Sequence, residues 1–128
     1  MTRGSTSNLV STGRGLDLAF DHHCHAPHSN LFTDIDLGMG TRMFRSGGGA
    51  ELGRHSGAYE KFWGIRALQP QVWPEGWGRE LMDLVGVQIN EDSLTNLEGR
   101  WVETINPELL KPSNLHRTQL TRRLKNIK

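Results

Sequence analysis

The chain has 128 residues, of which 35% are hydrophobic, so it has room for one domain with a small buried core. Its formal net charge is only +1, which gives no reason to expect a nucleic-acid partner. No apolar run approaches the roughly 18 residues of a membrane span, and the first residues do not resemble an export signal. We therefore expect neither nucleic acid nor membrane among the partners.

Short strands joined by turns fit most of the chain, because glycine is frequent and helical periodicity is weak before about Pro107. Residues 1–14 are expected to be disordered or to form an incomplete first coil. In one predicted strand, Ile35 and Leu37 alternate with aspartates, whereas Phe32 falls out of that alternation. We predict strands over Gly15 to His23, Asn30 to Leu37, Thr41 to Arg45, Lys61 to Leu68, Leu84 to Asn90 and Trp101 to Ile105.

Two of these segments share an F-x-x-I pattern about 30 residues apart, one starting at Phe32 and the other at Phe62. A third segment of similar character starts at Val85. Periods of 20 to 50 residues are typical of stacked repeats, in which each repeat covers the apolar face of the next. Coincidence among short apolar words remains the alternative.

The C-terminal part changes character. Asn106-Pro107-Glu108 is a helix-start signal, but Pro112 ends that helix after about one turn. A second helix is predicted from near Ser113, with an apolar stripe that includes Leu120 and Leu124. From residue 111 to 128 there are six Lys or Arg and no acidic residue. We expect this helix to pack on the body by its leucines and to leave a basic face in solvent.

The run F-D-H-H-C-H-A-P-H-S-N-L-F-T-D-I-D-L-G-M-G-T-R from Phe20 to Arg42 is followed by F-R-S-G-G-G, G-R-H-S-G and F-W-G-I-R-A. Together these motifs resemble the late coils of secreted bacterial right-handed parallel β-helix proteins of the pectate-lyase-like kind. The segment N-L-H-R-T-Q-L-T-R-R-L is similar to the helix that closes such chains.

The resemblance implies an all-β fold, a right-handed parallel β-helix (solenoid) fragment with a short C-terminal capping helix. Its coils would occupy residues 15–105, and a helical cap with a basic tail would occupy 106–128. Members of the family are several hundred residues long and are exported. The resemblance therefore implies the C-terminal part of a longer protein that is extracellular or periplasmic.

A histidine-rich stretch provides the first candidate site. Imidazole and thiolate groups are good zinc ligands, and four histidines and Cys24 lie between residues 21 and 28. His23, His25 and His28 are the candidate metal ligands. Alternate residues of a strand face opposite sides, so only two or three of the cluster can converge without a distant ligand. Lining a groove, or satisfying turn backbone, is the alternative role.

The second candidate site consists of charged side chains on predicted strands. Asp34 and Asp36 share one strand face, where they could bind calcium or serve as acid and base on a glycosidic bond. Arg42 and Arg66 could hold the carboxylates of an anionic sugar. His23 is a further candidate for the base of a lyase reaction. The alternative for all of these residues is a solvated outer surface.

The first hypothesis is a carbohydrate-active fragment that binds or cleaves an anionic polysaccharide, as a polysaccharide lyase or glycoside hydrolase if it is an enzyme, and that is inactive alone if its site is incomplete. The second is a non-enzymatic surface-binding β-helix module, and the third is a small metal-binding protein built on the histidines. Calcium and zinc are the cofactors these residues favour. Four tryptophans either form a sugar-stacking platform, or fill the interior or anchor the cap: Trp63, Trp73, Trp77 and Trp101.

Overall fold

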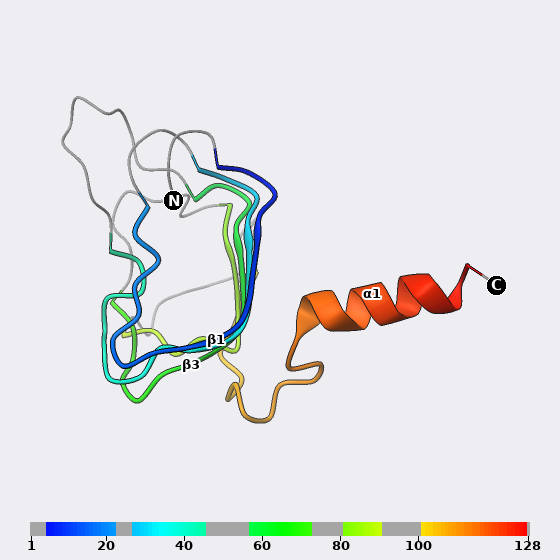
Figure 1. Cartoon of the computed structure of the whole chain (residues 1–128). Coiled ribbons are helices and arrows are strands. Elements are labelled where there is room, and N and C mark those ends of the chain that lie inside the picture. The colour runs from blue at the N-terminus through cyan, green and yellow to red at the C-terminus, as the bar shows by residue number, and fades with distance from the viewer. Residues whose placement is uncertain (1–4, 23–26, 46–56, 73–80, 91–100, 128) are drawn as a thin grey trace.

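The computed structural model describes residues 5–22, 27–45, 57–72, 81–90 and 101–127. Its strands belong to one sheet in chain order, and each runs parallel to the next (Figure 1). The described elements are β1 (Leu9–Arg14), β2 (Leu31–Asp36), β3 (Lys61–Arg66), β4 (Asp83–Val85), β5 (Val102–Glu103) and α1 (Leu115–Lys125). The all-β class is thus confirmed as a parallel sheet with one short helix.

The strand register confirms the predicted sequence repeat. Phe32 lies opposite Phe62, and Ile35 lies opposite Ile65. Leu84 pairs with Phe62, so the third repeat starts one residue earlier than the predicted Val85. Identical or similar side chains therefore form ladders across the sheet, and the rings of Phe32 and Phe62 stack at 4.8 Å with only 4° between their planes.

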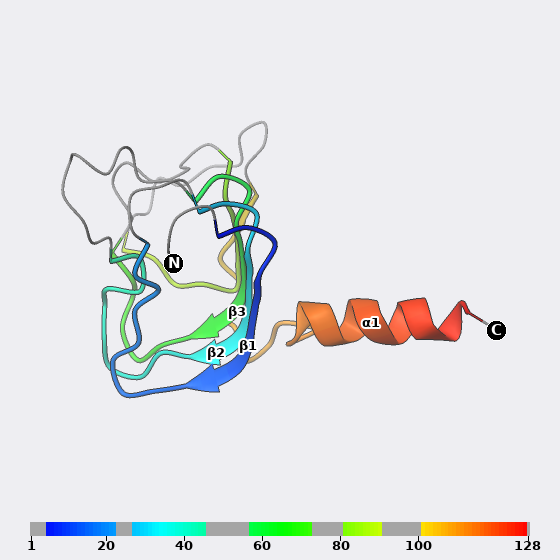
Figure 2. The same cartoon turned by 45° about the horizontal axis from the view of Figure 1, so that its top comes forward.

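A second row of chain faces the sheet across the core (Figure 2). Its segments are joined by scattered backbone hydrogen bonds, such as Phe20 N–H to the Met43 carbonyl at 2.7 Å, and by an isolated bridge between Gln71 and Ile89. The strands predicted over Gly15 to His23 and Thr41 to Arg45 fall here and are wrong within the described residues. Apolar residues alternate in this row because every second side chain, such as Leu18 and Phe20, packs on the core. The row lacks the repeated backbone pairing that defines a strand.

Each longer strand bends at one residue with a left-handed backbone. The φ angles are 59° at Thr12, 57° at Asp34 and 66° at Gly64, and Gly86, directly after β4, has a φ of 65°. The pairing register skips the Thr12–Asp34 and Asp34–Gly64 positions. Such a residue reverses the alternation of side chains, so Phe32 before the bend and Ile35 after it both enter the core. This bend explains why Phe32 did not fit the predicted alternation.

The first strand lies within residues 1–14, which were expected to be disordered or to form an incomplete first coil. β1 is an ordered edge strand paired with β2. Val10 continues the ladder of Phe32 and Phe62 and is 36% exposed, and Leu16 is 81% exposed. The apolar interior is therefore less well covered at the β1 side than beside β3.

The C-terminal segment crosses the outer face of the sheet before α1 begins. Leu110 is buried there, against the positions of Gly64 and Gly86. The helix predicted at Asn106-Pro107-Glu108 is wrong, because these residues form a turn in which the Asn106 side chain accepts from Glu108 N–H at 2.9 Å. The second predicted helix is confirmed, with Asn114 as its N-cap.

The helix does not pack on the body by its leucines, which corrects the predicted capping arrangement. No residue of α1 is buried, and Leu120, Leu124 and the following Ile127 are 44%, 59% and 71% exposed. Figures 1 and 2 show α1 extending away from the sheet. The sequence stripe is real, but the preceding anchor at Leu110 and Asn114 directs the helix outward, so only its first turns lie beside the sheet and Leu124 and Ile127 are exposed.

Candidate binding surface

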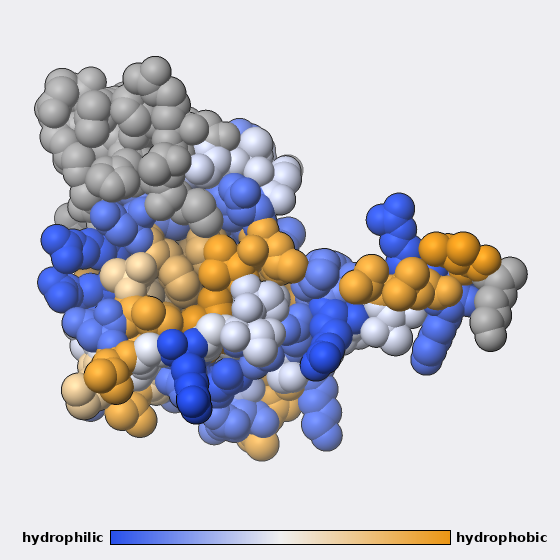
Figure 3. Space-filling view, viewed as in Figure 1, coloured by the Kyte–Doolittle hydropathy of each residue, from blue (hydrophilic) through white to orange (hydrophobic). Residues whose placement is uncertain are grey.

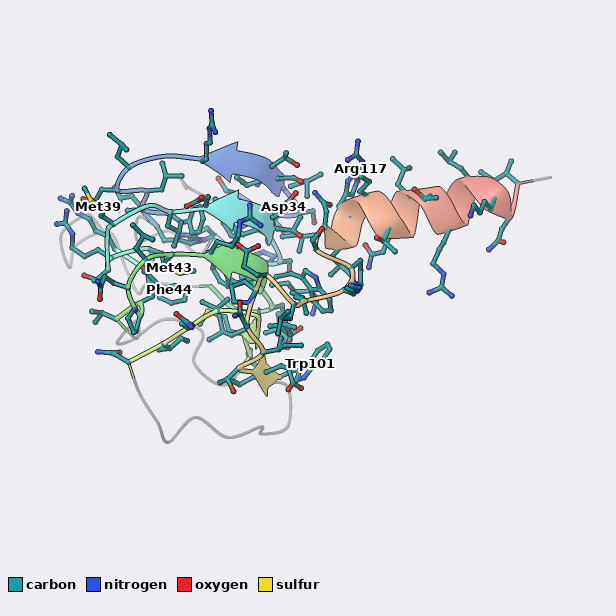
Figure 4. The ribbon with its side chains drawn as sticks, turned by 90° about the horizontal axis from the view of Figure 1, so that it is seen from below. Asp34, Met39, Met43, Phe44, Trp101 and Arg117 are labelled. Atoms are coloured by element: carbon teal, nitrogen blue, oxygen red, sulfur yellow. The ribbon has the colours of Figure 1, made fainter. Side chains whose placement is uncertain are left out.

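Among the described residues, two of the hollows on the outer face of the sheet contain charged and aromatic candidates. A charged groove of about 440 Å³ is lined by Thr12, Gly13, Arg14, Asp34, Asp36 and Arg66. An aromatic cleft of about 320 Å³ lies between the sheet and the first turns of α1, lined by Lys61, Phe62, Trp63, Asp83, Val85, Trp101, Leu115 and Gln119. Figure 4 shows Asp34 near the base of α1 and Trp101 apart from it. Strand β3 contributes side chains to both hollows.

The structure brings the predicted site residues Asp34 and Arg66 together. Arg66 Nη1 donates to Asp34 Oδ1 at 2.9 Å, and Asn114 Nδ2 donates to Asp34 Oδ2 at 3.4 Å. Arg66 also forms an ion pair with Glu108, with Nε 3.8 Å from Oε1. Both carboxylate oxygens of Asp34 are therefore engaged, and the contacts join the sheet to the C-terminal segment. This arrangement favours anchoring over acid and base work.

The two other charged candidates are separate from this anchor. Asp36 lines the charged groove, and its Oδ1 accepts from Gly38 N–H at 3.0 Å, as in a tight turn. Arg42 does not line the groove and pairs with Asp17 at 3.4 Å in an exposed ion pair. Such a pair contributes little to stability, so Arg42 remains available to solvent anions. The catalytic roles assigned to these residues stay predictions.

The predicted metal ligands fall mostly outside the described residues. His23 and His25 lie there, as does Cys24. His28 is exposed, with Nδ1 3.0 Å from Ser29 Oγ and 3.4 Å from Thr6 Oγ1. Within the described ranges, no three His, Cys, Asp or Glu side chains gather in the way a metal ion requires. The zinc and calcium hypotheses stay predictions.

A buried polar network under the sheet was missed by the sequence reasoning. His22 and Glu60 are fully buried, with Nε2 2.8 Å from Oε2, and His22 Nδ1 lies 2.6 Å from the Phe20 carbonyl. Asn30 donates to Glu60 Oε1 at 2.7 Å and accepts from Asn8 N–H and Nδ2 at 3.0 Å each. These contacts pair polar groups in the interior, with Glu60 Oε2 held, among the described residues, by its ion-pair contact to His22 alone, and they leave the imidazole inaccessible to a substrate.

The same spacing that relates the strands could have revealed this network. Asn8 and Asn30 are 22 residues apart, the offset between Leu9 in β1 and Leu31 in β2. An asparagine repeated at the offset of a coil is a signal that the two side chains stack. The His22 to Glu60 contact spans 38 residues and matches no strand offset, so no comparable signal announces it.

The aromatic cleft brings two indole rings together on the outer face. The rings of Trp63 and Trp101 meet edge to face, with centroids 5.9 Å apart and planes at 70°. Trp101 is 44% exposed, so the interior-filling alternative is wrong for this residue. Lys61 at the edge of the cleft forms an ion pair with Asp83. Trp73 and Trp77 lie outside the described residues.

No protein-family model matches the chain, and no curated protein or solved structure shows significant similarity to it. Across the described ranges, none of the helical structure has the length and hydropathy needed to cross a bilayer. Function therefore has to be argued from the geometry of the outer face.

Proposed function

We propose that this chain forms the last coils of a right-handed parallel β-helix protein and binds an anionic polysaccharide on its outer face. The β-helix is supported by five parallel strands in chain order, by the second row of chain across the core, and by strand offsets of 22, 30, 22 and 18 residues. Partial exposure of Val10 at the β1 side supports earlier coils stacked on β1. Such a protein would act outside the cytoplasm.

The observation that carries the binding function is the Trp63 and Trp101 pair in an open cleft beside Lys61. A pyranose ring presents an apolar face of C–H groups that packs on an indole, and a lysine ammonium attracts a uronate carboxylate. Asp83 already occupies one direction around Lys61, but an ammonium has three donors. The cleft thus combines an apolar platform with a cation at its rim.

Binding is favoured over cleavage because two members of the predicted catalytic set, Asp34 and Arg66, hold the C-terminal segment on the sheet. Asp34 uses both carboxylate oxygens, and Arg66 holds Asp34 and Glu108. The non-enzymatic surface-binding module is therefore the function that the geometry supports best.

Trp101→Ala tests the proposal by isothermal titration with oligogalacturonate. Trp101 is chosen over Trp63 because Trp63 Nε1 also donates to the Pro112 carbonyl at 2.6 Å, so its loss would disturb the fold. An aromatic contact worth about 1 to 1.5 kcal/mol predicts about five- to tenfold weaker binding. Leu109→Ala, at an exposed apolar residue that does not line the cleft, is the matched control.

Lys61→Gln separates anionic from neutral ligands. It is expected to reduce affinity for oligogalacturonate while leaving the weaker binding of a neutral glucan oligosaccharide unchanged. Unchanged affinity in Trp101→Ala would refute the cleft as the binding site. Ultraviolet absorbance detects unsaturated sugar products. If such products accumulate, the proposed function is a lyase activity and not binding alone.

A further inference from the structure

The outward face of α1 presents an apolar stripe that continues onto the body. With about 100° of rotation per residue, Leu120, Leu124 and the following Ile127 fall within an arc of about 60°. Leu120 lines a third hollow of about 320 Å³ at the base of the helix, together with Leu9 of β1. Figure 3 shows apolar atoms in a row along α1 and on the body beside its base. We call Leu9, Leu120, Leu124 and Ile127 the α1 corner.

The stripe is bordered by positive charge. Arg117 and Arg123 lie on its two sides by the same helical rotation, whereas Arg122 and Lys125 point elsewhere around the helix. Arg117 also lines the hollow at the helix base, where Figure 4 labels it. From residue 109 to 128 the sequence has no Asp or Glu. In the part of the chain that the structure describes, no carboxylate forms an ion pair with these four cations.

An isolated helix of this length is marginal in water. Helices shorter than about 12 to 15 residues rarely form alone, and most helical stability in proteins comes from packing of an apolar face. α1 has 11 residues, an N-cap and basic residues in its last turn, but no buried side chain. Its apolar stripe would gain protection from water if a partner covered it.

We propose that the α1 corner binds an acidic amphipathic helix of another protein. The apolar side of that helix would cover Leu120 and Leu124 and reach Leu9, and its carboxylates would meet Arg117 and Arg123. Charge selects this occupant, because a second α1 would bring the same cations into contact and repel them. Shape selects it over a flat anionic membrane, since the hollow between β1 and the helix base is concave and α1 has no aromatic residue. The proposal does not depend on the saccharide cleft.

The test uses the whole chain and a fluorescein-labelled synthetic helix with leucines at i, i+3, i+4 and i+7 and glutamates on either side. Fluorescence anisotropy measures its binding, and a peptide with lysines in place of the glutamates measures non-specific attachment. We expect binding of the acidic peptide alone, weakened by added salt. Leu120→Ser with Leu124→Ser is expected to reduce affinity at least tenfold.

A charge reversal provides the matched comparison. R117E with R123E is expected to lower affinity for the acidic peptide about tenfold or more and to favour the lysine peptide instead. R122E with K125E makes the same change in net charge on other sides of α1 and is expected to change affinity less than twofold. Far-UV circular dichroism of each variant shows whether the helix is kept, and the switch to the lysine peptide requires a folded corner.

Three results would overturn the proposal. One is no binding of the acidic peptide up to about 1 mM, a concentration at which a weak site would be detected. Another is equal loss of affinity in the two charge-reversed variants. The third is association of the chain with phosphatidylglycerol vesicles, or with itself in sedimentation, that depends on Leu120 and Leu124 while the peptide does not compete.

Discussion

Gly64→Ala should destabilise the protein at the point where the C-terminal segment crosses the sheet. A Cβ at position 64 would lie 2.9 Å from the Ser113 carbonyl oxygen and 3.4 Å from Leu110 Cδ2. The first contact is with backbone and is shorter than real Cβ atoms tolerate. Either Ser113 shifts, or the segment leaves its place on the sheet.

The expected magnitude combines three effects. A left-handed backbone costs alanine about 1 to 2 kcal/mol relative to glycine. The smaller entropy of the unfolded chain returns about 0.4 to 1 kcal/mol. Loosening of Leu110, whose full burial is worth about 1.5 to 3 kcal/mol, is partial if the segment only shifts. We therefore expect the free energy of unfolding to fall by about 2 to 3 kcal/mol.

Urea denaturation measures this change, and Gly13→Ala is the matched control in β1. Gly13 has no left-handed φ, and a Cβ there would meet only Ile35 Cγ2 at an ordinary 3.9 Å. Its substitution should be neutral or stabilise by up to about 1 kcal/mol. The loss of stability in Gly86→Ala should lie between those of Gly64→Ala and Gly13→Ala, because its Cβ would meet the movable end of Leu110 at 2.8 Å. A Gly64→Ala protein as stable as Gly13→Ala would refute the reasoning.

Substitutions at three further positions test the interior and the helix anchor. Phe32→Ala removes a ring from the stacked ladder and should lower the free energy of unfolding by about 3 to 5 kcal/mol in urea denaturation; a loss below 1 kcal/mol would contradict the stacked core. Glu60→Leu leaves His22 and Asn30 without their buried acceptor and should cost about 3 to 5 kcal/mol by the same measurement. Glu60→Gln should cost less, since an amide can accept from Asn30 and donate to the imidazole; equal losses would show that charge is essential. Asn114→Ala removes the helix cap and should cost about 0.5 to 2 kcal/mol, visible as lower ellipticity at 222 nm, and an unchanged spectrum would exclude the cap as an anchor.

The parts of the fold that were predictable are those encoded by local repetition. The F-x-x-I pattern at Phe32 and Phe62 gave the register of β2 on β3, because parallel coils place equivalent residues in one ladder. The helix after Ser113 was predictable from its own spacing. Both signals lie within a few residues of the element they describe.

The unpredicted parts depend on contacts between distant residues. A stripe of leucines in α1 shows that one face is apolar, but the direction of the helix is set by Asn114, which contacts Ser11 and Asp34 of other strands. The burial of His22 depends on Glu60, 38 residues away. The spacing of the histidine-rich stretch predicted candidate metal ligands but gave no indication that His22 faces inward.

The bend position in each strand shows why a residue can look functional and serve the fold. Thr12 and Asp34 adopt the same left-handed φ as Gly64 and Gly86, so the bend itself does not demand glycine. Glycine is required where Leu110 and Ser113 cross over β3 and β4, since any side chain there would meet them. Beside the crossing, Asp34 has room for a side chain and uses it to hold Asn114 and Arg66. In the sequence, Asp34 therefore looks like a candidate catalytic acid. In the structure, its carboxylate oxygens bind Arg66 and Asn114 and anchor the C-terminal segment.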